Sequence, residues 1–599
     1  MMKTRNGKGA APGKLRPVFF LLPSLLGILC FYLLPFLIIL VYSFFDDPIR
    51  RNYTGFVNYT ALLKNHAFSL ALKNTVLFLA GAVGSTLLIS LLLALALRRL
   101  LARSGLMKAA LALPLTVPAA TIVILVTILL DRYGALNGLI RVIGLKPENW
   151  LDGNWARRSM ILLYLWKHSG LFTLLLTAAL ETIPKDEREA ALLDGAGKAR
   201  IFFSIELHHI APALLFTALA GLFFGFRFFR EIGLLFGRYP AEGLYLVQHF
   251  MRNVFSLLDY QKLSAGAVLL FLLAALGMGI PALLIRRFGG DGNLLPQRDA
   301  PVRRKSRFRA GDLLPALILL ICALPTLLTL IHALAGEGEL RERYAAIWDR
   351  RSLDPESVRL LLWPEKLTLE SFRVFFSGGG LLRAYGRSLL YTLPAFAVQL
   401  PISLCAAWGF ARLKGKLRNV LLLLYMILLL LPWEVTLVPN FLIARWLGLL
   451  ETPWAVWLPS AFSPLPVYLL SKYFQRLPPE LREAAELDGA GEWQIFTRIS
   501  LPNIRPALGS MAFLGFIDLW NMVELPRTLL RQESLMPLSV TLANIRADAP
   551  LGPVFAASLA YLAPPLGLLL LLGPKNLSDQ TFIKSADDDS PGRESQNFP

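Results

Sequence analysis

The chain has 599 residues, of which 55% are hydrophobic and only 17% are charged, and its formal net charge is +20. A mean hydropathy of +0.54 is too high for an ordinary soluble globular protein, and three cysteines without CxxC or Cys/His spacing disfavour disulfides or a metal site. The motifs G-x-x-x-x-G-K-[ST], HExxH and GxSxG are all missing, so we expect neither nucleotide binding nor covalent catalysis on this chain.

The basic residues gather in short segments between apolar blocks. Residues 1–16 hold five Lys or Arg and no acid, and residues 286–309 hold eight basic and two acidic residues. Because basic short loops mark the cytoplasmic side of a membrane protein, we expect both segments in the cytoplasm. Nucleic-acid binding, the usual alternative at such a charge, is disfavoured because no stripe of basic and aromatic residues occurs.

Several apolar blocks exceed the roughly 18–20 residues that a helix needs to cross a bilayer. Helices satisfy their backbone polar groups within one segment, and the alternation typical of membrane β-strands is missing. We therefore expect an all-α membrane protein with about twelve transmembrane helices in two homologous six-helix halves. The expected spans are about 17–44, 71–97, 106–130, 158–182, 211–236 and 263–287, then about 312–334, 386–411, 418–443, 454–476, 507–531 and 552–573.

A segment rich in Gly, Pro and charge separates two halves that follow the same plan. Since each half crosses the membrane an even number of times, we expect both ends of the chain in the cytoplasm. The expected parts are a basic tail (1–16), the first half (17–287), a cytoplasmic linker (288–311), the second half (312–573) with an external loop (337–386), and a C-terminal tail (574–599).

One polar phrase occurs twice, as EAALLDGAG from Glu189 and as EAAELDGAG from Glu483, 294 residues apart. Each copy lies between the fourth and fifth spans of its half, in a segment that we name a coupling loop, 183–212 or 477–506. An ordinary hairpin that covers its own helix bundle is the simpler interpretation. The neighbouring spans have diverged far more than the two loops, and this difference indicates a shared task.

The first coupling loop reads as a helix, a turn and a second helix on the cytoplasmic face. Pro184 suits the first turn of a helix, and Gly195 suits a helix end. We expect the second helix over 198–208, with Pro212 opening the next membrane helix. The alanines of the phrase predict a surface that another protein can approach closely.

The phrase resembles the EAA loop of permease subunits in bacterial binding-protein-dependent ABC importers. Other stretches resemble the two permeases of the carbohydrate-uptake-1 (maltose/glycerol-3-phosphate type) family, here fused in one chain. These stretches are RYGALNGLIRVIGL with NWLDG, LYLWKHSGLFTLLLTAALETIP, LWPEKLTLESFRVFF, LGLLETPWAV and FIDLWNMVELP. The resemblance implies the type I ABC importer permease fold and alternating access for a sugar or sugar-like solute at the bacterial inner membrane.

The resemblance also implies partners beyond the lipid bilayer. Two separate ABC ATPase subunits would hold the ATP and Mg, so this chain would be no enzyme and would carry no cofactor, and an extracytoplasmic solute-binding protein would deliver the solute. Each coupling loop would dock on one ATPase. The residues implied in that contact are Glu189, Ala190, Ala191, Asp194, Gly195, Glu483, Ala484, Ala485, Asp488 and Gly489.

Two positions depart from the family pattern. His208 stands in the first loop where the family has a proline that the second loop keeps as Pro502, so the two loops are expected to kink differently. Arg387 stands where an asparagine is usual, as at Asn74 in the first half. A metal site at the adjacent histidines, His208 and His209, is disfavoured.

Charged residues in the fifth span of each half are candidates for the transport pathway. They are Arg227 and Arg230 in the first half, and Asp518, Asn521 and Glu524, with Trp520, in the second. Ionisable groups at membrane depth usually face a cavity or a partner. The internal repeat pairs Arg227 with Asn521 and Arg230 with Glu524, so we expect these spans to face each other. A static salt bridge is the alternative for the charges, and a core position is the alternative for Trp520.

Three other functions remain open from the sequence. A fused ABC permease for iron, polyamine or another small solute would share the same loops. An ion-gradient-driven secondary transporter would also have two six-helix halves, but it needs no paired EAA loops and no ATPase. A receptor or scaffold has no need of charges buried in two homologous spans.

Overall fold

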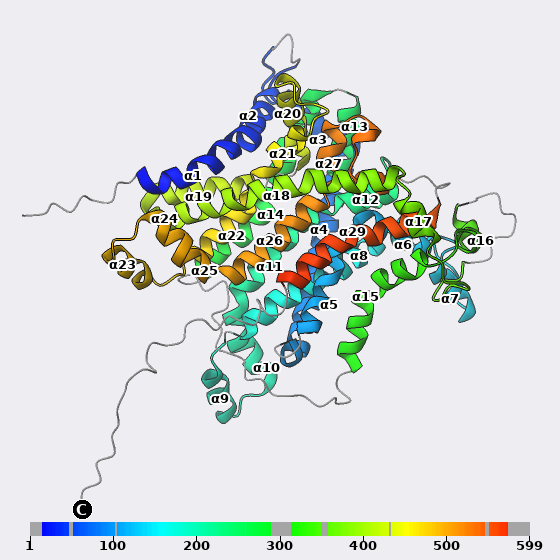
Figure 1. Cartoon of the computed structure of the whole chain (residues 1–599), viewed down its shortest axis with the longest axis horizontal. Coiled ribbons are helices and arrows are strands. Elements are labelled where there is room, and N and C mark those ends of the chain that lie inside the picture. The colour runs from blue at the N-terminus through cyan, green and yellow to red at the C-terminus, as the bar shows by residue number, and fades with distance from the viewer. Residues whose placement is uncertain are drawn as a thin grey trace, which may run out of the picture.

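The computed structural model describes residues 15–46, 52–101, 105–181, 183–257, 259–288, 313–348, 358–429, 433–544 and 550–572 (Figure 1). The expected tails 1–16 and 574–599 and the linker 288–311 lie almost wholly outside these residues. Among the described residues, the β-type pairing is a single isolated bridge between Phe45 and Tyr53. The expected all-α class is confirmed.

The helices of the first half are α1 (Leu15–Ile28), α2 (Leu34–Tyr42), α3 (Val57–Lys64), α4 (His66–Leu101), α5 (Gly105–Thr116), α6 (Ala119–Leu130), α7 (Ala135–Val142), α8 (Gly153–Glu181), α9 (Lys185–Leu193), α10 (Lys198–Ile201), α11 (Leu207–Arg227), α12 (Phe229–Phe236), α13 (Val247–Ser256) and α14 (Tyr260–Phe288). Those of the second half are α15 (Leu313–Ala333), α16 (Glu337–Trp348), α17 (Glu370–Phe376), α18 (Gly380–Arg412), α19 (Gly415–Leu429), α20 (Trp433–Trp446), α21 (Pro453–Ala461), α22 (Pro464–Phe474), α23 (Pro479–Leu487), α24 (Glu492–Gln494), α25 (Leu501–Asn503), α26 (Arg505–Trp520), α27 (Glu524–Leu529), α28 (Leu538–Ala543) and α29 (Leu551–Leu572). Short π-helical segments cover Leu29–Leu33, Phe202–Glu206 and Ile495–Ser500, and 3-10 turns cover Glu242–Leu244 and Glu533–Leu535.

In the described part of the chain, nine helical stretches are long and apolar enough to cross a membrane, or ten if α15 and α16, bent by 119°, count as one. The remaining expected spans, 418–443 and 454–476, are each built from two shorter helices, α19 with α20 and α21 with α22. Pro464 and Pro466 at the start of α22 explain the second break, since proline has no N–H to continue the ladder of α21.

The first helices of the two halves are exchanged. α1 packs against α18 of the second half, where Gly409 allows the backbone of Pro17 to approach closely, and the Ser24 hydroxyl lies 2.9 Å from that of Tyr425. α15 packs between the halves, against α29 of its own half and α5 of the first half, and the Trp166 indole N–H donates to the carbonyl of Ile321 at 3.1 Å. The two halves are therefore interlocked rather than merely joined by the linker.

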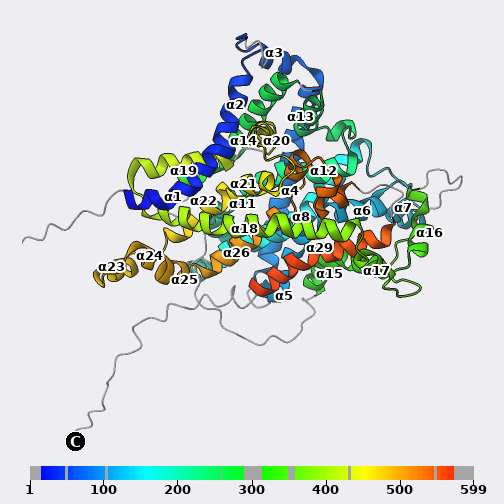
Figure 2. The same ribbon diagram turned by 45° about the horizontal axis from the view of Figure 1, so that its top comes forward.

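The elements between the spans divide into two faces. α9 and α23, which belong to the coupling loops, protrude at the lower left of Figure 1, and we name this side the coupling face. α3, α7, α13 and α16 lie along the upper and right-hand edges, and Figure 2 keeps α3 and α13 far from α23. We name that side the opposite face.

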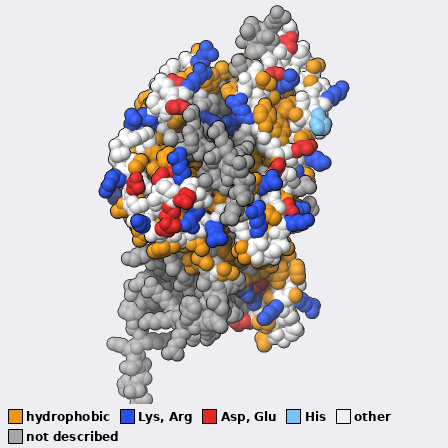
Figure 3. All heavy atoms as spheres, turned by 90° about the vertical axis from the view of Figure 1, so that its right-hand side faces the viewer, with side chains coloured by type: hydrophobic (Ala, Val, Ile, Leu, Met, Phe, Trp, Pro, Cys, Tyr) orange, Lys and Arg blue, Asp and Glu red, His pale blue; other side chains and the backbone are white. Residues whose placement is uncertain are grey.

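The segment expected as an external loop, 337–386, is mostly structured where it is described. It contains α16 and α17, and α18 begins at Gly380 rather than at the expected 386. The Glu337 carboxylate accepts hydrogen bonds from the backbone N–H groups of Leu551 and Gly552, at 3.1 and 2.8 Å, which ties this segment to the start of α29. Figure 3 shows acidic, basic and hydrophobic side chains interspersed on this side of the molecule.

Candidate functional site: an ion-paired gate and two coupling loops

The fifth span of each half is interrupted at the same relative place. In the first half α11 ends at Arg227 and α12 follows, and in the second half α26 ends at Trp520 and α27 follows. Phe228 (φ −67°, ψ −10°) and Asn521 (φ −87°, ψ 13°) carry the turns that end the longer helices. These interruptions bring charged side chains of the two halves next to each other.

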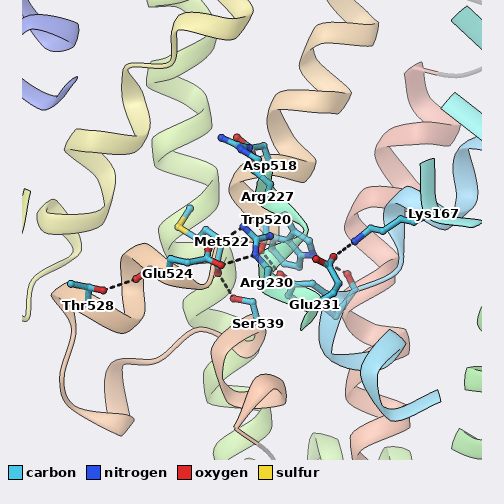
Figure 4. A network of polar contacts seen from close by, with 11 residues as sticks. Lys167, Arg227, Arg230, Glu231, Asp518, Trp520, Met522, Glu524, Thr528 and Ser539 are labelled. Atoms are coloured by element: carbon cyan, nitrogen blue, oxygen red, sulfur yellow. Dashed lines mark hydrogen bonds and ion pairs between the residues drawn. The ribbon is translucent and has the colours of Figure 1, made fainter. Parts of the chain in front are cut away.

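Two ion pairs join the halves there (Figure 4). The Arg230 guanidinium donates two hydrogen bonds to the Glu524 carboxylate, at 3.2 and 3.1 Å, and Arg227 pairs with Asp518. We name these four residues the gate. The Arg230–Glu524 pair is the better shielded, with side-chain exposures of 16% and 24% against 30% and 40% for the other pair. Removing one partner of a buried pair is costly because it leaves the other charge poorly solvated.

A second carboxylate lies beside Arg230. Glu231, which is buried, pairs with Lys167 of α8, which is half-buried. Lys167 and Arg230 therefore each have a carboxylate partner, and such pairing is how charged side chains are usually tolerated at membrane depth.

The gate encloses a cavity of about 40 Å³, to which Tyr32, Gln399 and Ser460 also contribute. Such a volume accommodates one or two water molecules, whereas pockets for small ligands are usually about 300–1,000 Å³. A small organic solute therefore does not fit into this cavity.

The structure changes one partner in the pairing expected from the repeat. Arg230 does contact Glu524, but Arg227 contacts Asp518 instead of Asn521. Asn521 lies at the turn after α26, whereas Asp518 lies about one helical turn earlier within it. Because of this offset of one helical turn, the Asp518 carboxylate and not the Asn521 amide contacts Arg227.

Trp520 belongs to the core of the second half. It is 1% exposed, its indole N–H donates to the carbonyl of Tyr561 at 3.0 Å, and its ring stacks on that of Tyr561. Of the two readings of this tryptophan, the structure matches the core position, because no face of the ring is open to a solute.

Several cavity residues, among them Tyr32, Gln399 and Ser460, were not identified from the sequence. Gln399 lies in α18 and donates from its amide to the carbonyl of Ser460 at 2.8 Å, while Tyr32 comes from the π-helical segment after α1. An isolated amide in an apolar span was an available signal for Gln399. Nothing local in the sequence marks Tyr32, which reaches the cavity only because the first helices are exchanged.

The two coupling loops begin alike. α9 and α23 each have nine residues and follow a proline, and each ends before a glycine in the left-handed region, Gly195 (φ +76°) or Gly489 (φ +80°). This conformation is accessible to glycine at little cost, which explains the helix ends predicted from the sequence.

The segments after the turns differ from the expectation and from each other. The first loop continues without a break from Lys198 through a π-helical segment into α11, so Pro212 lies inside a helix and does not open one. In the second loop the helix breaks at Ile504 (φ −100°, ψ 10°), two residues after Pro502. Proline removes one N–H from the ladder, and His208 at the equivalent place in the first loop does not.

The alanines of the motif are not uniformly available to a partner. Ala190 and Ala484 are exposed, but Ala191 is half-buried and Ala485 packs into the core of its own half. The expectation of a fully open small-residue surface is therefore wrong for Ala485. Larger exposed residues that the two copies share form a stripe beside these alanines: Asp186, Glu189, Leu193 and Asp194, matched by Glu480, Glu483, Leu487 and Asp488.

Each coupling loop is tied to its bundle by a three-residue ion cluster, which we name a coupling junction. In the first half the buried carboxylate of Glu206 pairs with Arg98 of α4 at 2.9 Å and with Arg188 of α9 at 2.7 Å. Burial lowers the pKa of Arg188, Glu206 opposes this shift, and the nearby Arg98 adds to it. One anion thus holds two cations.

The second junction has the opposite charge pattern. Arg412 at the end of α18 pairs with Glu486 of α23 at 3.0 Å and with Glu492 at 2.5 Å. Here one cation holds two anions, and Arg482 of α23 contacts Glu486 in addition, at 3.4 Å. Both junctions join the end of the second span to the coupling helix, but Glu206 lies in the π-helical segment before α11, whereas Glu492 lies in α24. Among the described residues, no three His, Cys, Asp or Glu side chains are grouped as a metal site requires.

Comparison with known proteins places this architecture in a family. The family model described as "Binding-protein-dependent transport system inner membrane component" matches twice, at residues 86–290 and 399–572, which together exceed half of the chain.

Curated relatives each match less than half of this chain. Protein LplC of Bacillus subtilis (strain 168) is 29% identical over 245 residues, 41% of this chain and 77% of the relative. The arabinooligosaccharides transport system permease protein AraQ of Halalkalibacterium halodurans is 33% identical over 189 residues, 31% and 68% of the two chains. The sulfoquinovosyl glycerol transport system permease protein SmoG of Agrobacterium fabrum is 31% identical over 255 residues, 41% and 82% of the two chains.

Proposed function

Because this chain belongs to the family of binding-protein-dependent transport system inner membrane components and contains two of them, we propose that it forms the complete membrane pathway of an ATP-driven sugar importer. The sugar assignment is supported by the relatives, among them permeases for arabinooligosaccharides, diacetylchitobiose and alpha-glucosides. The single observation that carries the ATP-driven mechanism is the pair of coupling loops with the same exposed stripe.

The partner on the coupling face is an ABC ATPase, one subunit per loop. The shared stripe presents one leucine, Leu193 or Leu487, each 89% exposed, between carboxylates. A stripe of this kind fits a groove with an apolar floor and a basic rim. Because the stripe is the same in both copies, the two grooves are alike. Hydrolysis of ATP occurs on those subunits, and ATP and Mg are bound there.

The basic short segments assign the coupling face to the cytoplasm, with both termini on that side. The opposite face then receives an extracytoplasmic solute-binding protein. The solute passes between the halves when the gate opens, and it is released toward the coupling face.

Opening the gate separates two guanidinium groups on one wall from two carboxylates on the other. The pathway then offers hydrogen-bond donors and acceptors with no net charge among the four gate residues. Sugar hydroxyl groups both donate and accept, so a neutral polyhydroxyl solute replaces the lost pairs without leaving a charge unmatched.

The test uses the complex of this chain with its ATPase and its binding protein, reconstituted in liposomes. Wild type is expected to hydrolyse ATP in response to solute and to accumulate it. The double variant Leu193→Asp with Leu487→Asp is expected to lose ATPase association and uptake by at least about tenfold, as loss of a central apolar contact typically does.

Leu192→Glu is the matched control, because the second loop carries Glu486 at the equivalent position. It is expected to keep both activities. Uptake that continues without any ATPase, driven by an ion gradient, would refute the proposed mechanism and favour a secondary transporter.

A further inference from the structure

Two short helices on the opposite face, α13 and α28, follow the gate helices in the chain and return into the bundle. We name them the return helices. They occupy the same place in the two halves, between the fifth and sixth spans, although they differ in length and in nearly every residue. The sequence gives no reason to single them out.

The start of each return helix is bonded to the second span of its half. The backbone N–H of Val247 donates to the Thr75 hydroxyl of α4 at 3.0 Å, and that of Leu538 donates to the Ser388 hydroxyl of α18 at 2.8 Å. Both hydroxyl groups are buried. The first N–H groups of a helix have no partner within it, so these bonds fix where each return helix begins.

The second residue of each return helix is bonded to the backbone of the fifth span of its half, close to the gate. The Gln248 amide donates to the carbonyl of Phe226 at 3.3 Å, and the Ser539 hydroxyl donates to that of Met522 at 2.6 Å (Figure 4). Phe226 directly precedes Arg227, and Met522 lies two residues before Glu524. An amide in one half and a hydroxyl in the other thus hold the backbone at the interruption beside the gate.

The second spans continue from the return helices to the coupling junctions. Thr75 and Arg98 lie 23 residues apart on the uninterrupted helix α4, and Ser388 and Arg412 lie 24 apart on α18. At 1.5 Å per residue, each helix covers about 35 Å between these two contacts. Arg98 and Arg412 are the residues through which α4 and α18 enter the junctions.

We propose that in each half the second span and the return helix form one mechanical connection between the coupling loop and the gate, and that Thr75, Gln248, Ser388 and Ser539 are its positioning residues. This inference rests on the proposed function. When the ATPases draw the coupling loops together, α4 and α18 tilt, the return helices move with them, and the carbonyls beside the gate are displaced until the ion pairs separate. Buried polar groups that find no water have little alternative bonding, so the connection keeps its bonds as it moves.

The first test measures ATP hydrolysis by the full reconstituted complex without solute or binding protein. Ser539→Ala and Gln248→Met are expected to raise this basal rate about two- to tenfold, the fold-change of losing one typical hydrogen bond, because the closed gate loses its support. Co-purification of the ATPase is expected to stay at the wild-type level, which separates this effect from failed docking.

Ser558→Ala is the matched control. Ser558 is also a buried serine, but its hydroxyl bonds to Val554 within its own helix and contacts no gate residue. The two halves also supply conservative exchanges: Thr75→Ser and Ser388→Thr are expected to keep the wild-type basal rate, whereas Thr75→Ala and Ser388→Ala raise it. If these residues served only in local packing, the basal rate would be the same for the hydroxyl-keeping variant and for the alanine variant at each position.

A second measurement follows the gate directly. Ser463, which lines the gate cavity, is replaced by cysteine in a background without Cys30, Cys322 and Cys405, and labelling by a membrane-impermeant thiol reagent is timed. Ser539→Ala is expected to speed labelling. If Ser539→Ala has the same basal ATP hydrolysis and the same labelling rate as the control Ser558→Ala, the proposal is overturned. This comparison holds even if both variants fold less well than wild type.

The connection also predicts how variants combine. Thr75 and Glu206 contact opposite ends of the same stretch of α4, which is about 35 Å long. The basal ATP hydrolysis of the double variant Thr75→Ala with Glu206→Gln is therefore expected to match that of the stronger single variant. Distant residues without a shared mechanism give multiplied effects instead, and that result would contradict a single path. If wild type itself shows no ATP hydrolysis with its partners, the proposed function has failed, whereas wild-type hydrolysis that none of these variants changes refutes this inference alone.

Discussion

Four side chains form the ion pairs that we propose as the gate between the halves. Arg227, Arg230, Asp518 and Glu524 come from different halves, and each cation meets an anion across the interface. A pair at an exposed surface contributes little, but the Arg230–Glu524 pair is largely shielded and has bidentate geometry. The gate is therefore stable when closed and depends on both partners.

Arg230→Ala and Glu524→Ala are each expected to impair uptake strongly, because the charge left behind has no partner. The magnitude for a buried pair is about 3–5 kcal/mol at most, and the partial exposure here reduces it. The exchanged pair, Arg230→Glu with Glu524→Arg, is expected to restore part of the activity. Uptake assays and thermal melting of the purified protein check both.

The exposed pair of Lys262 and Asp259 serves as a control. Lys262→Ala, which leaves the Asp259 carboxylate as the cap of α14, is expected to change stability by no more than about 1 kcal/mol. If the exchanged gate pair is no better than the single variants, these two residues do not act as a pair.

The coupling elements show how one architecture is held by two charge patterns. Glu206 holds two arginines in the first half, and Arg412 holds two glutamates in the second. In both cases a central ion, buried in the case of Glu206 and half-buried in the case of Arg412, links the end of the second span to the coupling helix and to the segment after it. What the halves share is the position of the ion cluster and not its sign.

Glu206→Gln is expected to uncouple the first loop from α4. The neutral amide bonds the two arginines less strongly than a carboxylate does, by roughly 1–2 kcal/mol for each charge-assisted bond. The ATPase still docks, because the exposed stripe is unchanged, but fewer solute molecules enter per ATP hydrolysed. The ratio of uptake to hydrolysis in liposomes measures this.

Glu187→Gln is the comparison within the same loop. The Glu187 carboxylate pairs with His209, but both side chains are much more exposed than Glu206. It is expected to leave the ratio near the wild-type value. Equal ratios for the two variants would show that the junction does not transmit force.

The whole molecule is held together by exchanged first helices. α1 lies on the second half, and α15 packs on α5 of the first half as well as on α29 of its own, so each half completes the packing of the other. The close approach at Gly409 shows how specific this contact is, since an added Cβ there would lie 2.8 Å from the backbone oxygen of Pro17.

A protease site inserted in the linker 288–311 is expected to leave assembly and uptake intact after cleavage, because the exchanged helices hold the halves. Co-purification of the two fragments in mild detergent is the measurement. Gly409→Leu is expected to weaken that association, whereas Gly84→Leu, at a position where an added Cβ has no other atom within 4 Å, is not. Fragments that separate at once after cleavage would show that the linker is what holds the halves.

Local signals in the sequence were enough for the element types and for the coupling loops. In a membrane, long apolar blocks permit only helices. The first glycine of each EAA phrase ends the coupling helix by adopting the left-handed backbone conformation. The repeat spacing also indicated that Arg230 and Glu524 occupy equivalent places. All of these are properties of a few neighbouring residues or of one internal comparison.

Only the tertiary structure decided which residues meet. It assigned Asp518 rather than Asn521 to Arg227, placed Trp520 in the core, turned Ala485 inward and joined Thr75 and Ser388 to helices far along the chain. The physical reason is that helix rotation and the exchange of α1 and α15 are set by packing over the whole bundle. A sequence fixes the period of a helix, but the neighbours against which it packs decide the direction in which each side chain points.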